Sequence, residues 1–188
     1  MSLRLYLKSL IIPFQAISQA LPQTGTIMDI GCGNGEVASF LARLSTRQVI
    51  GIDPDKLRLQ ATASTQQNLK LVHADALTYK FPLLAGAVLS DMLHHLSPQQ
   101  QRLLLTKTIA ALQPGGVIIV KEIDRTDMIR SRLSRLWDWL FYPQDKIAYF
   151  STLALTRLLT ALHLTVTHIN ANTWVPASIH LYIGVKHA

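Results

Sequence analysis

Short apolar runs rich in isoleucine and valine alternate along the chain with longer segments in which apolar residues recur at helical spacing. This alternation predicts an α/β fold in which helices cover both faces of a mostly parallel sheet. The predicted strands of this part are residues 26–30, 48–53, 69–75, 86–93 and 115–122. The predicted helices between them are residues 36–45, 54–67 and 97–113, the last with Ser97 as its N-cap before Pro98.

The end of the chain departs from this alternation. Residues 151–163 predict one more helix, and residues 164–170 and 178–187 predict two strands. A parallel crossover between two strands needs about a dozen or more residues, and the connection here is shorter. We therefore expect the two closing strands to pair antiparallel.

Composition and charge narrow the class of protein. The 188 residues suit one ordinary domain, and 49% hydrophobic against 15% charged residues argue against disorder. Eighteen Lys and Arg against eleven Asp and Glu give a formal charge of +7, which leaves nucleic acid, an anionic membrane face and an acidic small molecule open as partners. Cys32 is the single cysteine, so an internal disulfide is excluded and the cytoplasm is the predicted compartment.

The N-terminal 22 residues are apolar enough to resemble a signal peptide or a membrane-spanning helix. Arg4 and Lys8 are interleaved with leucines, and Pro13 interrupts the apolar stretch. The stretch shows neither a clear signal-peptide layout nor the ~20 apolar residues of a spanning helix. We expect an amphipathic helix that packs on its own domain, with docking on a membrane surface as the alternative.

The clearest candidate for chemistry is "DIGCGNGE", where Gly31, Gly33 and Gly35 follow the first predicted strand. Glycines there allow a ligand to approach backbone N–H groups at the start of a helix. Asp53 ends the second strand, where an acid can accept hydrogen bonds from a ribose. A dinucleotide fold has both features, but the GxGxG spacing and Asp29 before the glycines favour a ligand with a positive group over a pyrophosphate.

The sequence resembles the class I S-adenosylmethionine-dependent methyltransferases over about residues 25 to 122. Five motifs occur in the family's order: "IMDIGCGNGEVA", "VIGIDPD", "LVHADAL", "AVLSDMLHHLS" and "LQPGGVIIVKE". The resemblance implies the family's Rossmann-like seven-stranded sheet with an antiparallel last strand. It also implies S-adenosylmethionine as cofactor and S-adenosylhomocysteine as product.

The resemblance also implies cofactor contacts. Gly31, Gly33 and Gly35 would lie under the methionine part, with Asp29 near its amino group directly or through water. The remaining assignments place Asp53 on the ribose hydroxyls, Pro54 at the adenine wall, Asp75 on the adenine amino group, the Ala76 backbone on the ring, and Ser90 and Asp91 beside the sulfonium.

Two histidines follow the strand that would end beside the methyl group. His94 or His95 is a candidate general base for a hydroxyl or amine of the acceptor, and the alternative is that the pair shapes the pocket or caps the next helix. Asp91, Glu122 and Asp124 also fall at strand ends, as in methyltransferases that hold magnesium. Because the Asp-Asn pair of those enzymes is missing, no metal is predicted.

The acceptor is expected to bind near residues 123–150, the insertion after the fifth strand. Trp137, Asp138, Tyr142 and Tyr149 are the predicted contacts, beside several arginines. This combination suits an apolar or aromatic acceptor with an acidic group, or a lipid-like one at an anionic membrane. The fourth-strand motif reads "SDML" rather than the Asn or Asp-Pro-Pro-aromatic of base-amine methyltransferases, which disfavours nucleic acid.

We therefore expect one methyltransferase domain over residues 1–188, acting on oxygen or nitrogen of a small acceptor, as a monomer or homodimer. Its predicted parts are an N-terminal helix (1–24), the cofactor core (25–122), the insertion (123–150) and a closing helix with two strands (151–188). The alternatives are an RNA methyltransferase and a binding protein for S-adenosylmethionine without catalysis. Peripheral contact with a membrane stays open.

Overall fold

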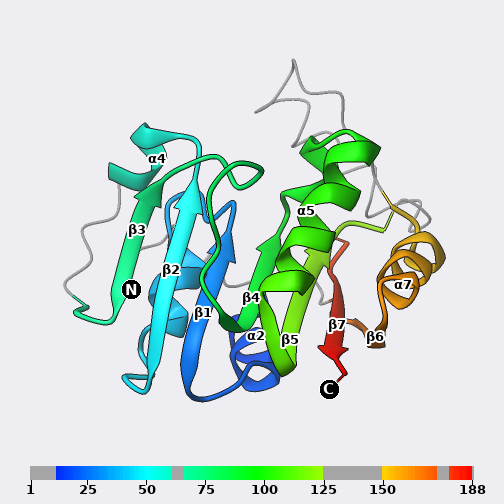
Figure 1. Cartoon of the computed structure of the whole chain (residues 1–188), viewed down its shortest axis with the longest axis horizontal. Coiled ribbons are helices and arrows are strands. Elements are labelled where there is room, and N and C mark those ends of the chain that lie inside the picture. Colours follow the sequence, from blue (N-terminus) through cyan, green and yellow to red (C-terminus); the bar gives the residue numbers. More distant parts are fainter. Residues whose placement is uncertain (1–11, 61–65, 125–149, 173–177, 188) are drawn as a thin grey trace.

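The computed structural model describes residues 12–60, 66–124, 150–172 and 178–187. Its centre is a seven-stranded sheet with the order β3-β2-β1-β4-β5-β7-β6 (Figure 1). In chain order the strands are β1 (Gly25–Ile30), β2 (Arg47–Asp53), β3 (Leu69–His73), β4 (Leu84–Ser90), β5 (Leu112–Glu122), β6 (Leu164–Asn170) and β7 (His180–Lys186). The helices are α2 (Phe14–Ala20), α3 (Glu36–Leu41), α4 (Lys56–Gln60), the short 3₁₀ turn η1 (Leu93–His95), α5 (Pro98–Ala111) and α7 (Thr152–Ala161).

The pairing confirms the predicted fold class. Strands β1 to β5 pair parallel, and β7 is antiparallel to both of its neighbours, β5 and β6. The β6–β7 connection is short, which is why these strands form an antiparallel pair. The chain order therefore reverses direction across the sheet between β1 and β4.

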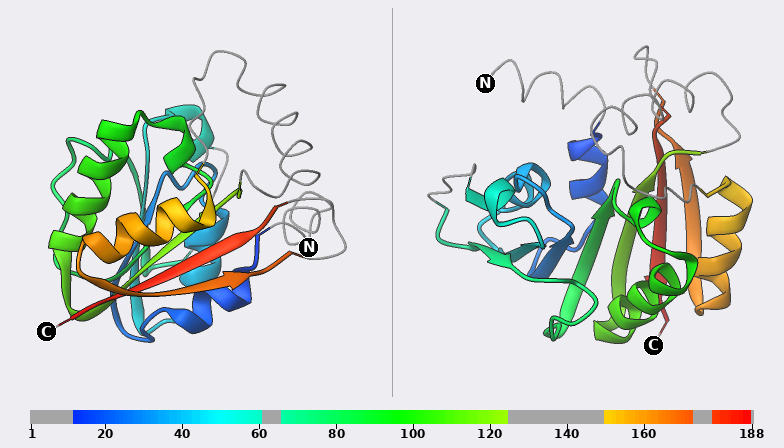
Figure 2. Two further views of the ribbon diagram at one scale, coloured as in Figure 1. Left: turned by 90° about the vertical axis from the view of Figure 1, so that its right-hand side faces the viewer. Right: turned by 90° about the horizontal axis from the view of Figure 1, so that it is seen from above.

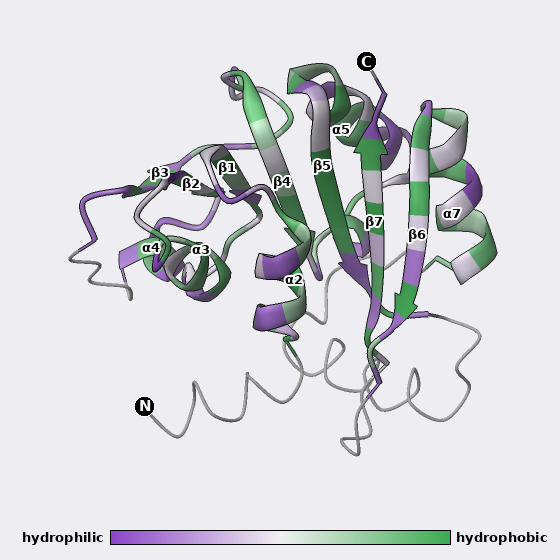
Figure 3. Ribbon diagram, turned by 90° about the horizontal axis from the view of Figure 1, so that it is seen from below, coloured by the Kyte–Doolittle hydropathy of each residue, from purple (hydrophilic) through white to green (hydrophobic). Residues whose placement is uncertain are grey.

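Apolar residues on each sheet face build a separate core. One core lies under α5 and α7 and contains Leu104, Ile118 and Leu155. The other lies under α2 and α3 and contains Ile17, Ile27 and Ile119. Figure 2 shows these helix pairs on opposite sides of the sheet. Because both faces are covered, the central strands are mostly apolar in their middle, and β5 is hydrophobic along its centre and hydrophilic at its carboxyl end (Figure 3).

Helix α2 is fixed to the sheet through a buried arginine at the start of β2. The Arg47 guanidinium donates to the carbonyls of Ser18, Leu21 and Pro22 and to the Ser18 hydroxyl. These contacts satisfy carbonyl groups at the helix C-terminus, which have no partner within the helix. The second half of the predicted N-terminal helix therefore packs on its own domain, as expected.

Several predicted boundaries differ from the structure, among them those of the third, fourth and fifth strands. The fourth strand was expected to reach residue 93, but β4 ends at Ser90 and Asp91 takes a left-handed backbone with φ of 52°. The apolar residues after Asp91 enter η1, where Leu93 is buried as it would be in a strand. The third strand ends at His73 rather than residue 75, because Asp75 starts a turn through a hydrogen bond to Leu77. The fifth strand begins at Leu112, three residues before the predicted start at 115.

Candidate functional site

The glycine turn follows β1 at the carboxyl edge of the sheet. Gly31, Gly33 and Gly35 all have left-handed φ angles, of 71°, 55° and 72°. The N–H groups of Gly31 and Cys32 both donate to the Ile52 carbonyl at 2.9 Å, which ties the turn to β2. Glycine is therefore required here by the backbone path, because other L-residues avoid this conformation.

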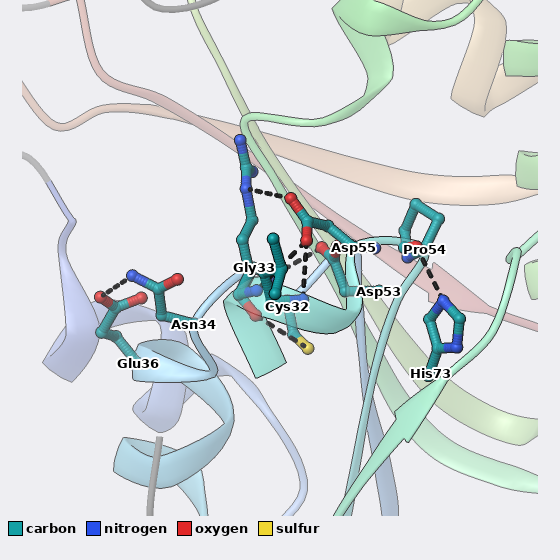
Figure 4. Close-up of polar contacts among 10 residues, drawn as sticks. Cys32, Gly33, Asn34, Glu36, Asp53, Pro54, Asp55 and His73 are labelled. Atoms are coloured by element: carbon teal, nitrogen blue, oxygen red, sulfur yellow. Dashed lines mark hydrogen bonds and ion pairs between the residues drawn. The ribbon is translucent and has the colours of Figure 1, made fainter. Parts of the chain in front are cut away.

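Asp53 joins the glycine turn to the end of β2. Its Oδ2 accepts from the Gly33 N–H at 2.7 Å, and its Oδ1 accepts from the Asp55 N–H at 2.8 Å. The side chain is almost fully buried, and Figure 4 shows it between the turn and the following loop. A carboxylate with two backbone donors is held in one orientation at the place predicted for ribose recognition.

Asp29 lies beneath the turn and faces helix α3. Its Oδ2 accepts from the Ala38 N–H at 2.9 Å, and the side chain is 1% exposed. Burial raises the pKa of this carboxyl from 3.8 to about 7, a rise that the Ala38 hydrogen bond partly offsets. The structure thus gives Asp29 a partner within the fold, and its predicted role beside the amino group of the cofactor stays a prediction.

The raised pKa of Asp29 has a testable effect on stability. Between about pH 4 and pH 7 the folded state binds this proton more tightly than the unfolded state, so the free energy of unfolding falls as pH rises. The slope from this group is at most about 1.4 kcal/mol per pH unit. Asp29→Asn should remove this component of the slope and be more stable than the wild type at about pH 8. Urea denaturation at several pH values measures it, and an unchanged slope would contradict the assignment.

The predicted adenine contacts lie at the ends of β2 and β3. The Pro54 carbonyl contacts Nε2 of His73 at 3.0 Å, and Asp75 is exposed apart from its turn contact with Leu77. Ala76 is buried, and its carbonyl accepts from Nζ of Lys107 on α5 at 2.9 Å. Lys107 was not predicted from the sequence, because a lysine on an otherwise ordinary helix gives no sign of a contact 31 residues away.

The two histidines differ in exposure. His94 is 1% exposed, and its Nδ1 lies 2.5 Å from Oε2 of Glu122, whose Oε1 accepts from the Leu93 N–H. His95 is half-buried, and its ring centroid lies 4.3 Å from that of His94. Glu122 therefore anchors η1 to the end of β5. Sequence reasoning considered Glu122 only as a metal ligand and missed this contact.

The carboxylates weighed for a metal have other partners. Oδ2 of Asp91 pairs with Lys121, Glu122 binds the loop that holds His94, and Oδ2 of Asp124 accepts from the Thr152 hydroxyl. Within the described ranges, no group of three or more His, Cys, Asp or Glu side chains could hold a metal ion.

The predicted acceptor site cannot be compared with the described part of the structure. The acceptor contacts Trp137, Asp138, Tyr142 and Tyr149 lie outside the described residues, as does most of the predicted insertion. None of the described helices is long and apolar enough to cross a membrane.

The chain is similar to known methyltransferases. Residues 5–169 match the family model described as a methyltransferase domain. An uncharacterized methyltransferase of Mycobacterium tuberculosis is 31% identical over 134 residues, which cover 69% of this chain and 66%, just under two thirds, of that protein. These matches confirm the resemblance indicated by the five motifs.

Solved structures share the fold at lower identity. The 1,6-didemethyltoxoflavin-N1-methyltransferase of Burkholderia thailandensis, solved with 1,6-didemethyltoxoflavin and S-adenosylhomocysteine, has a TM-score of 0.77 at 17% identity, over 96% of this chain and 79% of that one. Human N-acetylserotonin methyltransferase, solved with S-adenosylmethionine, has a TM-score of 0.74 at 16% identity, over 94% and 52%.

Proposed function

Because the chain belongs to the family of methyltransferase domains, we propose that it transfers the methyl group of S-adenosylmethionine to an oxygen or nitrogen of a small acceptor. The acceptor is apolar, aromatic or lipid-like. The observation that carries the proposal is the Asp53 carboxylate fixed on the Gly33 N–H, at the edge of the sheet where open α/β folds bind ligands.

The residues at this edge fit the proposed cofactor. A Cβ on Gly33 would meet no atom within 4 Å, so the turn presents bare backbone to open space. Asp53 stands beside it as the acceptor for ribose hydroxyls, and Asp75 and Ala76 follow at the end of β3 for the adenine. S-adenosylmethionine, when bound, supplies a methyl group already activated by its sulfonium. The chain's own residues then have to orient the acceptor, exclude water and, for a protonated nucleophile, take up a proton.

Of the two candidate bases, we assign proton uptake to His95. His94 is buried against Glu122 and holds η1 in place, whereas His95 is partly exposed beside it. Histidine in the turn after β4 suits general-base catalysis because imidazole exchanges protons near neutral pH. His94 then supports the His95 ring through their tilted ring contact.

The acceptor can be identified by mass spectrometry. The full chain is incubated with methyl-labelled S-adenosylmethionine and fractionated extract of its source cell, with the Asp53→Ala variant as the matched control. We expect the label in a small or lipid-like molecule with the wild type alone. Label in RNA would support the RNA alternative instead. Cofactor binding without transfer to any fraction would identify a binding protein and refute the proposed activity.

A further inference from the structure

Strand β6 forms one edge of the sheet. Within the part of the chain that the structure describes, it pairs with β7 alone, so the backbone N–H and C=O groups on its other side point away from the sheet. The register with β7 is unbroken from Leu164 to Asn170, without a bulge. Such an edge is a template for another strand, and proteins usually protect it with charged residues, proline or a bulge. Protection of β6 would therefore have to come from its side chains.

The side chains of β6 do not protect this edge. Its sequence is "LTVTHIN", which contains no lysine, arginine, acidic residue or proline, and its last four residues are exposed. The opposite edge differs, because β3 is shorter and carries the exposed Lys70. Strand β6 is therefore the edge at which a further strand can add.

Exposed apolar side chains lie beside this edge on both faces of the sheet. On the face that carries α2 and α3, Ile169 is 39% exposed and Val185 of β7 is exposed with it, because α2 packs against β5 and α3 against β1 and β2. On the other face, α7 packs more against β6 than against β7, and its Leu153 is 57% exposed. Figure 1 shows α7 at this end of the sheet. The edge is thus bordered by apolar surface on both faces.

Charged residues are sparse over the whole of α7 and β6. Residues 152–170 contain a single Lys, Arg, Asp or Glu, which is Arg157, although 15% of the chain is charged. Depletion of charged residues is a property of the cores of protein interfaces. The formal charge of +7 would attract an acidic segment, but β6 offers it no lysine or arginine with which to pair. The strand that fits this edge is a neutral one, and β6 of a second copy is neutral and of matching length.

We propose that β6 pairs antiparallel with β6 of a second copy of this chain, so that the two seven-stranded sheets join into one. An antiparallel pair of identical strands has two-fold symmetry, and Thr167, the central residue of β6, then lies opposite its own copy. Because the other edge carries Lys70, assembly ends at the dimer. This contact does not depend on the cofactor or on the acceptor.

Helix α7 adds area to the proposed contact. A stable interface buries about 800 Å² on each partner, which is more than a pair of short strands provides. Since α7 lies over β6 in each copy, pairing of the two strands brings the two helices close to each other across the symmetry axis. The exposed Leu153 and the neutral residues around Arg157 are then covered by the same dimer.

Charge at Thr167 tests the strand pairing. Sedimentation velocity on the full chain between about 1 and 100 µM gives the dissociation constant, and we expect the wild type to dimerise in this range. Thr167→Lys and Thr167→Glu should each weaken the dimer by at least about tenfold, because like charges then oppose each other across the axis. An equimolar mixture of the two variants should recover most of the lost affinity, since opposite charges then meet. The matched control is Leu57→Lys, at an exposed position on α4, which should dimerise like the wild type.

Other results would overturn the proposal. A wild type that stays monomeric at about 100 µM would show that the edge does not pair with itself. A dimer that both Thr167 variants leave intact would lie at another surface, and assembly beyond the dimer would contradict the two-fold pairing. Two monomeric variants whose mixture also stays monomeric would exclude the contact between the two copies of Thr167.

Discussion

Replacing Asp53 with alanine is expected to lower the affinity for S-adenosylmethionine by about a hundredfold or more. The carboxylate accepts hydrogen bonds from the N–H groups of Gly33 and Asp55, so its removal releases the glycine turn from β2 and also removes the acceptor for the ribose. Hydrogen bonds to charged groups are each worth about 1.5–3 kcal/mol. The loss of the two proposed hydrogen bonds from the ribose hydroxyls to Asp53 therefore accounts for a change in affinity of this size.

Asp55→Ala is the matched control for this prediction. Asp55 is exposed, and its Oδ1 accepts from the N–H groups of Leu57 and Arg58 at the start of α4. Its loss should cost about 1 kcal/mol of stability as a lost cap and leave cofactor affinity unchanged. Calorimetric titration gives the affinities and thermal unfolding gives the stabilities. Equal cofactor affinity in Asp53→Ala and the wild type would refute the assignment of Asp53.

The sequence predicted the centre of the sheet well because β1, β4 and β5 contain apolar runs that are buried on both faces. Periodicity could not locate the end of β4, since Met92 and Leu93 continue the apolar run after the chain has turned at Asp91. The positions of the glycine turn and of Asp53 were predictable because they depend on residue type and local spacing.

The partners of buried charges were not predictable. His94 and Glu122 are 28 residues apart, and Asp91 and Lys121 are 30 apart, so their pairing depends on which strands become neighbours. Asp29 shows the same limit in another form. Its position near the end of β1 was clear, but whether its side chain faces a ligand or helix α3 follows from the pleat of the strand, which places alternate side chains on opposite faces.

The second large effect is expected at Gly31. Gly31→Ala should lower the free energy of unfolding by about 2–5 kcal/mol, because alanine pays about 1–2 kcal/mol for the left-handed φ of 71° and more for overlap with its neighbour. The added Cβ would lie 2.9 Å from Cβ of Met92, an atom next to the backbone that cannot rotate away. This loss is a large share of the stability of an ordinary domain.

Gly33→Ala separates folding from ligand binding at the same turn. Gly33 also has a left-handed φ, but an added Cβ would meet nothing within 4 Å, so the stability loss should be limited to about 1–2 kcal/mol of backbone strain. If the open space above Gly33 is where the cofactor lies, this variant should bind S-adenosylmethionine at least about tenfold more weakly because the methyl group blocks close approach to the backbone. Urea denaturation and calorimetry on both variants test the pair. A Gly33→Ala protein with unchanged affinity would place the cofactor away from this turn, whereas equal stability losses in the two variants would mean that Met92 moves aside.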